Sequence, residues 1–270
     1  MTSRVLTSLS PARRRFVIGV VVLVVLTVAG AILADLLRRD PPLRPVAQDR
    51  SGPVLLVPGY GGSTASLEVL AEALEAEGRD VRIARAGGPG TSDLREAAAD
   101  LADVVDLTLE ETGAPSVDIV GYSAGGVVLR LYVADLGGGS TVRRAVTLSS
   151  PHHGTDLAAL ARSLGTRACP VACQQLDPDS DLLRELNAGA EAPAGPQWVV
   201  LWTEDDTTVV PPVSGDLEGA LGYAVQGICP GLTVAHPDVP RTPAVIAMVE
   251  SALGTADPVE PDASVCGPRS

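Results

Sequence analysis

Ser123 stands in a setting that suits a nucleophile, within the sequence Gly121-Tyr122-Ser123-Ala124-Gly125. The apolar run VDIV precedes it and a helical pattern follows, and G-x-S-x-G carries chemistry in that strand–turn–helix context. On so tight a turn, the residues two before and two after the serine crowd each other, and glycine relieves the crowding. We therefore predict that Ser123 is a nucleophile lifted above the edge of a sheet.

A serine hydroxyl needs a base to accept its proton and an acid to orient that base. When G-x-S-x-G carries the nucleophile, the acid and then the histidine follow it along the chain. The chain has three histidines. His152 and His153 come soon after the nucleophile, whereas His236 comes late, after the apolar run LTVA. The order of the residues therefore predicts His236 as the base.

Two adjacent aspartates compete for the role of the acid. Asp205 and Asp206 both follow the apolar run QWVVLW, in the turn where the acid is expected. Asp206 begins a D-x-x-V-x-P pattern, which is common after this kind of nucleophile, and we favour it for that reason. Asp205 stays open as the alternative acid, and otherwise as a solvated turn residue.

Acyl transfer also requires hydrogen-bond donors for the oxyanion. We expect them to be the backbone N–H of Ala124, directly after the nucleophile, and that of Tyr60 in the turn PGYGG. Gly59 in this turn would let the backbone approach the substrate, unless the turn is a plain strand–helix connection. Tyr122 and His152 are further predicted to contact the substrate, because open α/β sheets place their sites at strand ends. Adjacent histidines are awkward metal ligands, so we predict no metal and no cofactor.

Short apolar runs alternate with longer helical patterns along the chain. Strands are predicted at 54–57, 80–84, 117–120, 144–148 and 198–202, and helices at 64–77, 91–111, 124–134, 179–186 and 242–253. Continuously apolar strands between helices indicate a mostly parallel sheet covered on both faces. The insertion between Leu148 and Trp198 is short, which predicts a minimal lid or none and an open cleft.

The first 52 residues are predicted to lie outside the catalytic domain. Residues 1–15 are expected to be cytoplasmic, 16–37 a membrane anchor, 38–52 a linker, 53–254 the catalytic domain and 255–270 an irregular tail. Residues 16–34 carry no charge and Arg13, Arg14 and Arg15 precede them, so the catalytic domain is expected outside the cytoplasmic membrane. The alternative is a signal peptide cleaved near Ala29-Gly30-Ala31, which would release the domain.

Charge and cysteine content narrow the range of partners. The net charge is −13, and residues 45–270 hold 13 arginines against 31 acidic residues. Such a domain repels phosphate backbones, which excludes nucleic-acid binding. The four cysteines, Cys169, Cys173, Cys229 and Cys266, all follow the apolar segment and predict two disulfides in an oxidising compartment. Buried thiols are the alternative, and zinc is disfavoured because no histidine stands at ligand spacing.

Several motifs together resemble the small secreted bacterial lipases and esterases of the α/β-hydrolase superfamily. They are VPGYGGS (57–63), ETGAPSVDIVGYSAGGVVLRLYV (111–133), SSPHHGTD (149–156), CQQLDPDSDLLRELN (173–187), DDTTVVPP (205–212) and ICPGLTVAHPDVP (228–240). The resemblance spans residues 52–253. It implies an α/β-hydrolase fold that cleaves carboxylic esters, with the catalytic and oxyanion residues already named.

The same resemblance has two further implications. It implies disulfides between Cys173 and Cys229 and between Cys169 and Cys266. Many similar proteins carry His-Gly at the oxyanion turn, where this chain has Pro58-Gly59. The donated group is a backbone N–H, so the role is expected to survive this difference.

The expected substrate is an ester or a lipid, and the expected state is a monomer. Two other functions remain open on the sequence. An acyltransferase would use the same residues but pass the acyl group to an envelope lipid or sugar. A binding module would keep the nucleophile turn as a feature of the fold without catalysis.

Overall fold

The computed structural model describes residues 11–38, 46–85, 90–165 and 167–267, and the chain divides into two units. The first, Met1–Leu43, contains the helix α1 (Pro11–Arg38). Among the described residues, no helix is both long enough and apolar enough to cross a membrane. The predicted cytoplasmic segment and linker fall partly outside the described residues, at 1–10 and 39–45.

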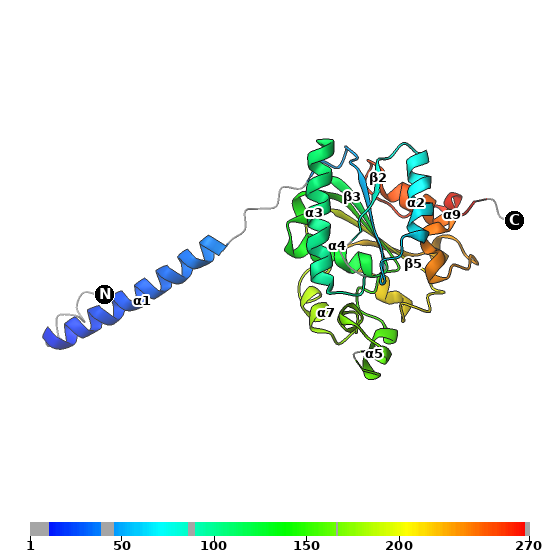
Figure 1. Cartoon of the computed structure of the whole chain (residues 1–270). Helices are drawn as coiled ribbons and strands as arrows, with labels where there is room; N and C mark the ends of the chain where they lie inside the picture. Colours follow the sequence, from blue (N-terminus) through cyan, green and yellow to red (C-terminus); the bar gives the residue numbers. More distant parts are fainter. Residues whose placement is uncertain (1–10, 39–45, 86–89, 166, 268–270) are drawn as a thin grey trace. The chain divides into compact units, whose positions relative to one another are not determined.

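The second unit, Arg44–Ser270, is built on a six-stranded sheet (Figure 1). Its strands are β1 (Val54–Val57), β2 (Val81–Ile83), β3 (Val117–Tyr122), β4 (Val142–Leu148), β5 (Gln197–Trp202) and β6 (Leu221–Ala224). Their order is β2-β1-β3-β4-β5-β6, and every neighbouring pair described is parallel. The chain runs from β1 to β2 on one side and then returns to β3 on the other. The adjacent carboxyl ends of β1 and β3 therefore form the switch point at which such sheets bind ligands.

Helices cover both faces of this sheet (Figure 1). Those in the second unit are α2 (Ala65–Ala76), α3 (Leu94–Thr112), α4 (Ala124–Asp135), α5 (Asp156–Ser163), α6 (Val171–Gln175), α7 (Asp181–Leu186), α8 (Val225–Ile228) and α9 (Pro243–Ala252). Short 3₁₀ turns follow α4, β5 and α8 and precede the C-terminus, at Gly138–Ser140, Pro212–Gly215, His236–Arg241 and Ala263–Cys266. The expected parallel sheet with helices on both sides is thus confirmed.

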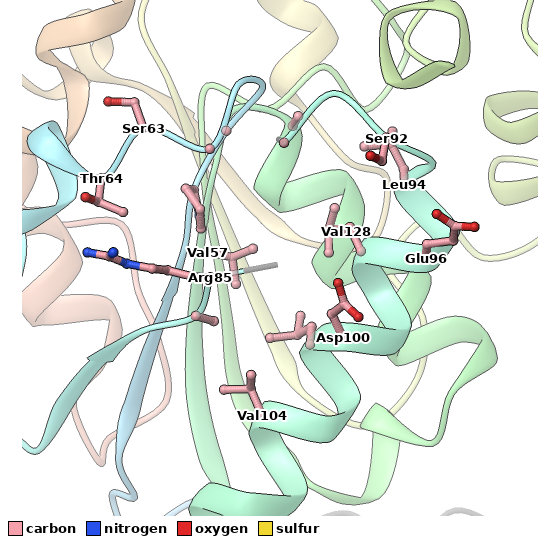
Figure 2. A pocket seen from close by; sticks show the side chains of 18 of the residues that line it. Val57, Ser63, Thr64, Arg85, Ser92, Leu94, Glu96, Asp100, Val104 and Val128 are labelled. Atoms are coloured by element: carbon pink, nitrogen blue, oxygen red, sulfur yellow. The ribbon is translucent and has the colours of Figure 1, made fainter. Parts of the chain in front are cut away.

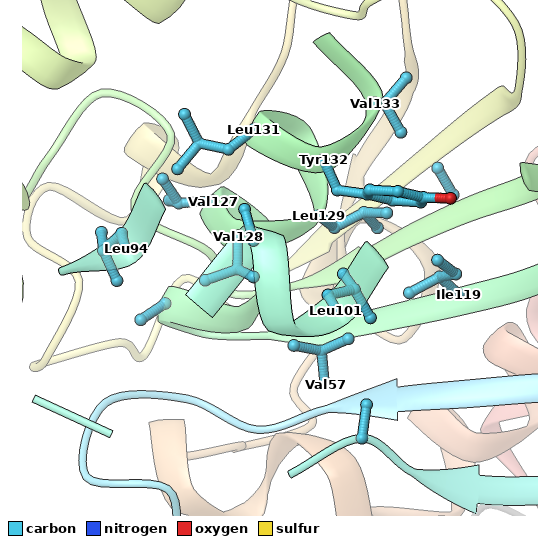
Figure 3. Close-up of a cluster of buried hydrophobic side chains, with 14 of the residues drawn as sticks. Val57, Leu94, Leu101, Ile119, Val127, Val128, Leu129, Leu131, Tyr132 and Val133 are labelled. Carbon is cyan, nitrogen blue, oxygen red and sulfur yellow. The ribbon is translucent and has the colours of Figure 1, made fainter. Parts of the chain in front are cut away.

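Two apolar cores, one on each face, hold the helices to the sheet. In β1, Leu55 and Val57 belong to the core beneath α3 and α4, whereas Val54 and Leu56 belong to the core beneath α2 and α9. This alternation follows from the period of two along a strand. Figure 3 shows the first core, where side chains of α3 and α4 meet the sheet. Because both faces are buried, β1 and β3 are apolar at almost every position and hold their carboxyl ends rigidly.

Two disulfides staple short segments of the second unit, and their pairing corrects the one implied by resemblance. Cys169 pairs with Cys173, at a Cα–Cα distance of 5.1 Å, and Cys229 pairs with Cys266, at 5.6 Å. The first bond closes the turn that leads into α6, where the two Cα atoms come within disulfide range. The second joins the residue after α8 to the C-terminal 3₁₀ turn. The implied pairs Cys173–Cys229 and Cys169–Cys266 are therefore wrong.

A buried polar cluster lies at the amino ends of β3 and β4, away from the nucleophile. Asp118 accepts hydrogen bonds from Arg143 at 2.8 and 2.6 Å and from Arg79 at 2.6 Å. Arg143 also donates to the carbonyl oxygens of Leu253 and Gly254, directly after α9. The guanidinium of Arg143 thus supplies positive charge at the C-terminus of a helix, where the helix dipole favours it.

Candidate active site

The nucleophile turn lies between β3 and α4, with Ser123 at its tip. Ser123 has φ 53° and ψ −126°, in the left-handed half of backbone space that only glycine enters freely. A Cβ on Gly121 would lie 2.7 Å from the carbonyl carbon of Gly125, which is the crowding that the sequence predicted. A Cβ on Gly125 would instead overlap the carbonyl oxygen of Val57, at the end of the neighbouring strand β1. Both glycines are therefore required by close backbone approach.

Three side chains from distant parts of the second unit form a continuous hydrogen-bond relay. The Oγ atom of Ser123 lies 3.0 Å from Nε2 of His236. Nδ1 of the same ring lies 2.7 Å from Oδ2 of Asp206. All three residues are buried. A carboxylate accepts the proton on Nδ1, so Nε2 presents its lone pair to the serine hydroxyl.

The turn that follows β5, at residues 203–206, is called the acid turn below. It gives the two aspartates different partners. Asp206 accepts hydrogen bonds at Oδ1 from the amides of Thr208 and Val209, both at 2.8 Å, and holds His236 with Oδ2. Asp205 does not contact the ring, and its Oδ2 accepts the amide of Val234 at 2.9 Å. The geometry thus brings Asp206, and not Asp205, to the base.

The turn predicted to bind the oxyanion follows β1 and lies against Ser123. A Cβ on Gly59 would come within 2.8 Å of the Cβ of Ser123, so the turn passes the serine closely. The following amides of Gly61 and Gly62 donate to the carbonyls of Gly90 and Gly59. On the other side of the serine, Ala124 is the first residue of α4, and the first amides of a helix have no partner within it. Predicted donors therefore flank Ser123 from two directions.

Tyr122 and His152, both predicted to contact substrate, take other places. The buried hydroxyl of Tyr122 donates to the carbonyl oxygen of His236 at 3.0 Å, and the two rings pack at 5.2 Å between centroids. Burial, and then the negative charges of Asp206 and Asp238, raise the pKa of Tyr122, so its hydroxyl stays a donor. His152 is 0 % exposed and bonds Thr147 at 3.0 Å, so it lines no open cleft.

The segment after β4 is hydrogen-bonded to the chain that follows Asp206. The hydroxyl of Thr155 donates to the carbonyl of Thr208 at 2.7 Å and accepts the amide of Val210 at 3.1 Å. The amide of Asp156 donates to the carbonyl of Val210 at 2.8 Å. These hydrogen bonds therefore fix the backbone at Thr208 and Val210, directly after Asp206.

A cavity of about 490 Å³ opens beside the oxyanion turn, between that turn and α3 (Figure 2). It is lined by the apolar side chains of Val57, Leu94, Val104 and Val128 and by polar side chains. Gly59 and Ala124, which flank the nucleophile, line it, whereas none of the three relay residues does. In the described part of the chain, no group of three His, Cys, Asp or Glu residues could hold a metal ion.

Comparison with known proteins agrees with this architecture. Residues 52–167, which hold the oxyanion turn and the nucleophile turn, match the family model described as the alpha/beta hydrolase fold. This chain has the α/β-hydrolase fold. Solved structures of lipases are similar to it. Aspergillus fumigatus lipase B is 21 % identical with a TM-score of 0.69, over 85 % of this chain and 60 % of that one.

Two forms of another lipase are also similar to this chain. The propeptide form of Bacillus licheniformis lipase BlEst2 has 18 % identity and a TM-score of 0.62, over 83 % of this chain and 53 % of that one. The mature form has 19 % identity and a TM-score of 0.56, over 76 % and 89 %. The chain thus spans little more than half the length of the first two structures, and identities this low show the fold alone. No curated protein matches the chain in sequence.

Proposed function

We propose that this α/β-hydrolase is a serine ester hydrolase that works through an acyl-enzyme. The observation that carries the proposal is the unbroken relay from Ser123 through His236 to Asp206, at 3.0 and 2.7 Å, on a turn that strains the nucleophile. A structural serine gains nothing from a base and an acid at these distances, whereas a nucleophile requires both.

The residues perform two half-reactions. In the first, Nε2 of His236 takes the Ser123 proton as Oγ bonds to the ester carbonyl carbon. The bond from that carbon to the alcohol oxygen then breaks, and His236 gives its proton to the leaving alcohol. In the second, His236 takes a proton from water, the hydroxide attacks the acyl-enzyme, and the Ser123 oxygen leaves with the proton. Asp206 holds the imidazole and stabilises its positive charge in both.

The oxyanion of each tetrahedral intermediate would be bound by the amides of Tyr60 and Ala124. Two observations support this assignment. Gly59 passes close to Ser123, and Ala124 is the first residue of α4. Developing negative charge is stabilised at a helix N-terminus and by fixed backbone donors. Tyr122 acts as a positioning residue in this scheme, because it holds the backbone of His236.

The favoured substrates are uncharged carboxylic esters. Residues 45–270 carry 31 acidic residues against 13 arginines, which disfavours anionic substrates such as phosphorylated ones. The two disulfides are compatible with an extracytoplasmic location, where such bonds persist. We propose on this basis that the activity lies outside the cytoplasm.

Release of p-nitrophenol from acetate through palmitate esters tests this function, with the full chain and its Ser123→Ala variant. We expect Ser123→Ala to lose activity roughly a thousandfold or more, because removing one triad residue leaves only binding and oxyanion stabilisation. Ser140→Ala, at an exposed serine in a surface turn, is the matched control and should be unchanged. Residual turnover within about tenfold of wild type in a folded Ser123→Ala protein would refute the nucleophile.

Covalent labelling separates this proposal from the other functions. A fluorophosphonate reacts with an activated serine whatever the natural acceptor. A binding module would not label. Labelling without ester hydrolysis, followed by transfer when an alcohol is added, would identify an acyltransferase.

A further inference from the structure

The backbone of Val234, two residues before the base, is fixed at both of its hydrogen-bonding groups by side chains of the acid turn. The hydroxyl of Thr203 donates to the carbonyl oxygen of Val234 at 2.7 Å. The carboxylate of Asp205 accepts the amide of Val234 at 2.9 Å. Thr203 and Val234 are both buried, so the hydrogen bond between them is shielded from water, whereas the Asp205 side chain is exposed.

Gln226, in α8, completes the same arrangement from a third segment. Its amide nitrogen lies 3.0 Å from the Thr203 hydroxyl, 2.9 Å from the Asp205 carboxylate and 3.1 Å from the carbonyl of Leu232. Its amide oxygen accepts the backbone N–H of Glu204 at 2.9 Å. One side chain therefore ties together the acid turn and the loop that leads to His236.

We propose that Thr203, Asp205 and Gln226 form a clamp that sets the position of the base against the acid, with Asp205 as its principal positioning residue. This inference rests on the proposed function. The two consecutive aspartates have different roles. Asp206 binds the imidazole of His236, and Asp205 binds the backbone amide of Val234, two residues before it. The carbonyl of His236 is held separately, by Tyr122 of the nucleophile turn.

The need for a clamp follows from where the base stands in the chain. His236 opens a 3₁₀ turn at the end of a loop that follows α8, not a long helix or strand. A loop residue has few backbone partners of its own, yet the ring must meet Ser123 and Asp206 together. A shift of about 1 Å in such an arrangement can reduce turnover roughly a hundredfold. Hydrogen bonds two residues upstream restrict that shift.

The test compares Asp205→Ala, Asp205→Asn and Glu204→Ala in the full chain. Glu204 is the adjacent exposed acid, and the clamp uses only its backbone amide, so Glu204→Ala removes the same charge and leaves the clamp intact. For Asp205→Ala we expect kcat on p-nitrophenyl butyrate to fall roughly tenfold or more with KM within about twofold. The rate of Ser123 labelling by a fluorophosphonate should fall in parallel.

Asp205→Asn keeps an acceptor oxygen and should recover most of the lost kcat, while Glu204→Ala should match wild type. Equal loss in Asp205→Asn and Asp205→Ala would mean that charge alone matters and would overturn the clamp. So would an Asp205→Ala protein with kcat within about twofold of wild type.

A second variant keeps the proposal testable if Asp205→Ala does not fold. Gln226→Met has a similar size but makes none of the four bonds, and it should lower kcat and labelling rate in the same direction without changing KM. Wild-type kinetics in this variant would reject the clamp. A wild-type protein that neither labels nor hydrolyses any ester would instead count against the proposed function itself.

Discussion

At the scale of the residue, Asp205 and Asp206 show how neighbours of one type acquire different tasks. Two backbone amides fix the carboxylate of Asp206, which leaves one oxygen for His236. Asp205 turns to the amide of Val234 instead. A pattern of residue types ranks the two aspartates, but it does not show that Asp205 binds the loop that leads to His236. That information depends on Gln226 and Val234, which no catalytic motif marks.

His152 should make the stability of the protein fall in acid. Burial, and then the positive charges of Arg130 and His153, lower the pKa of its imidazole well below the ordinary 6.5. As pH falls below about 6.5, the unfolded chain binds a proton that the folded chain refuses. Stability is therefore full above 6.5 and declines below it, by up to about 1.4 kcal/mol per pH unit from this group.

The check is a comparison of unfolding free energies for wild type and His152→Gln between pH 5 and 8. We expect the variant to be less stable at pH 8, because it packs less well beside Thr147. Its stability should nevertheless fall less steeply toward pH 5, since glutamine does not titrate. Parallel curves for the two proteins would show that His152 does not titrate differently in the folded and unfolded states.

At the scale of the element, the strand–turn–helix unit around Ser123 holds its nucleophile at the expense of stability. A non-glycine residue at φ 53° costs about 1–3 kcal/mol. The fold tolerates this because β3 and α4 fix the turn from both sides.

The strain predicts that two substitutions of Ser123 differ in their effect on stability. Ser123→Gly and Ser123→Ala both remove the nucleophile, and both should be inactive. Glycine relieves the backbone strain. It also makes the unfolded chain more flexible, and this added entropy lowers the free energy of unfolding by about 0.5–1 kcal/mol. We expect Ser123→Gly to be the more stable of the two by about 1 kcal/mol in chemical unfolding. Equal stability would mean that the strain at this turn is no larger than the entropic cost of the glycine.

Elements with a full apolar face could be predicted from the sequence, whereas short elements could not. The strand at Val54–Val57 has its predicted bounds, because both faces are buried and every residue is apolar. The edge strand β6, with the sequence LGYA, was not predicted, since it is short and mostly half-buried. The helices α5 and α6 were missed as well, because they are only 8 and 5 residues long.

Some residues of the site could likewise be predicted from the sequence, and others could not. The motif around Ser123 and the order of the chain placed the relay residues in advance, and their distances fit that hypothesis. The pairing of the cysteines was wrong, because resemblance carries no information on which loops approach. His152 was given to the substrate because it follows a strand, but a histidine at a strand end can also turn inward.

At the scale of the whole molecule, Arg143 connects the segment before β1 with the segment after α9. Arg143 reaches Asp118 in β3, the carbonyl of Gln48 before β1, and the carbonyls of Leu253 and Gly254 after α9. Burial raises the pKa of Asp118, although its hydrogen bonds to Arg143 and Arg79 act against that rise. The buried ion pair of Asp118 and Arg143 therefore stabilises the fold only while both partners are present.

Loss of Arg143 should therefore loosen the unit as a whole. We expect Arg143→Met to lower the free energy of unfolding by about 3 kcal/mol, because Asp118 keeps only Arg79 and the end of α9 loses its cation. Arg82→Met is the matched control, since Arg82 pairs with Glu111 at the surface, and it should cost no more than about 1 kcal/mol. Urea unfolding followed by circular dichroism measures both. If Arg143→Met unfolded at the same urea concentration as Arg82→Met, the buried cluster would not be what joins the first and last segments of the unit. A loss of stability in Arg143→Met with unchanged kcat in the folded protein would separate this cluster from the active site at the opposite ends of the strands.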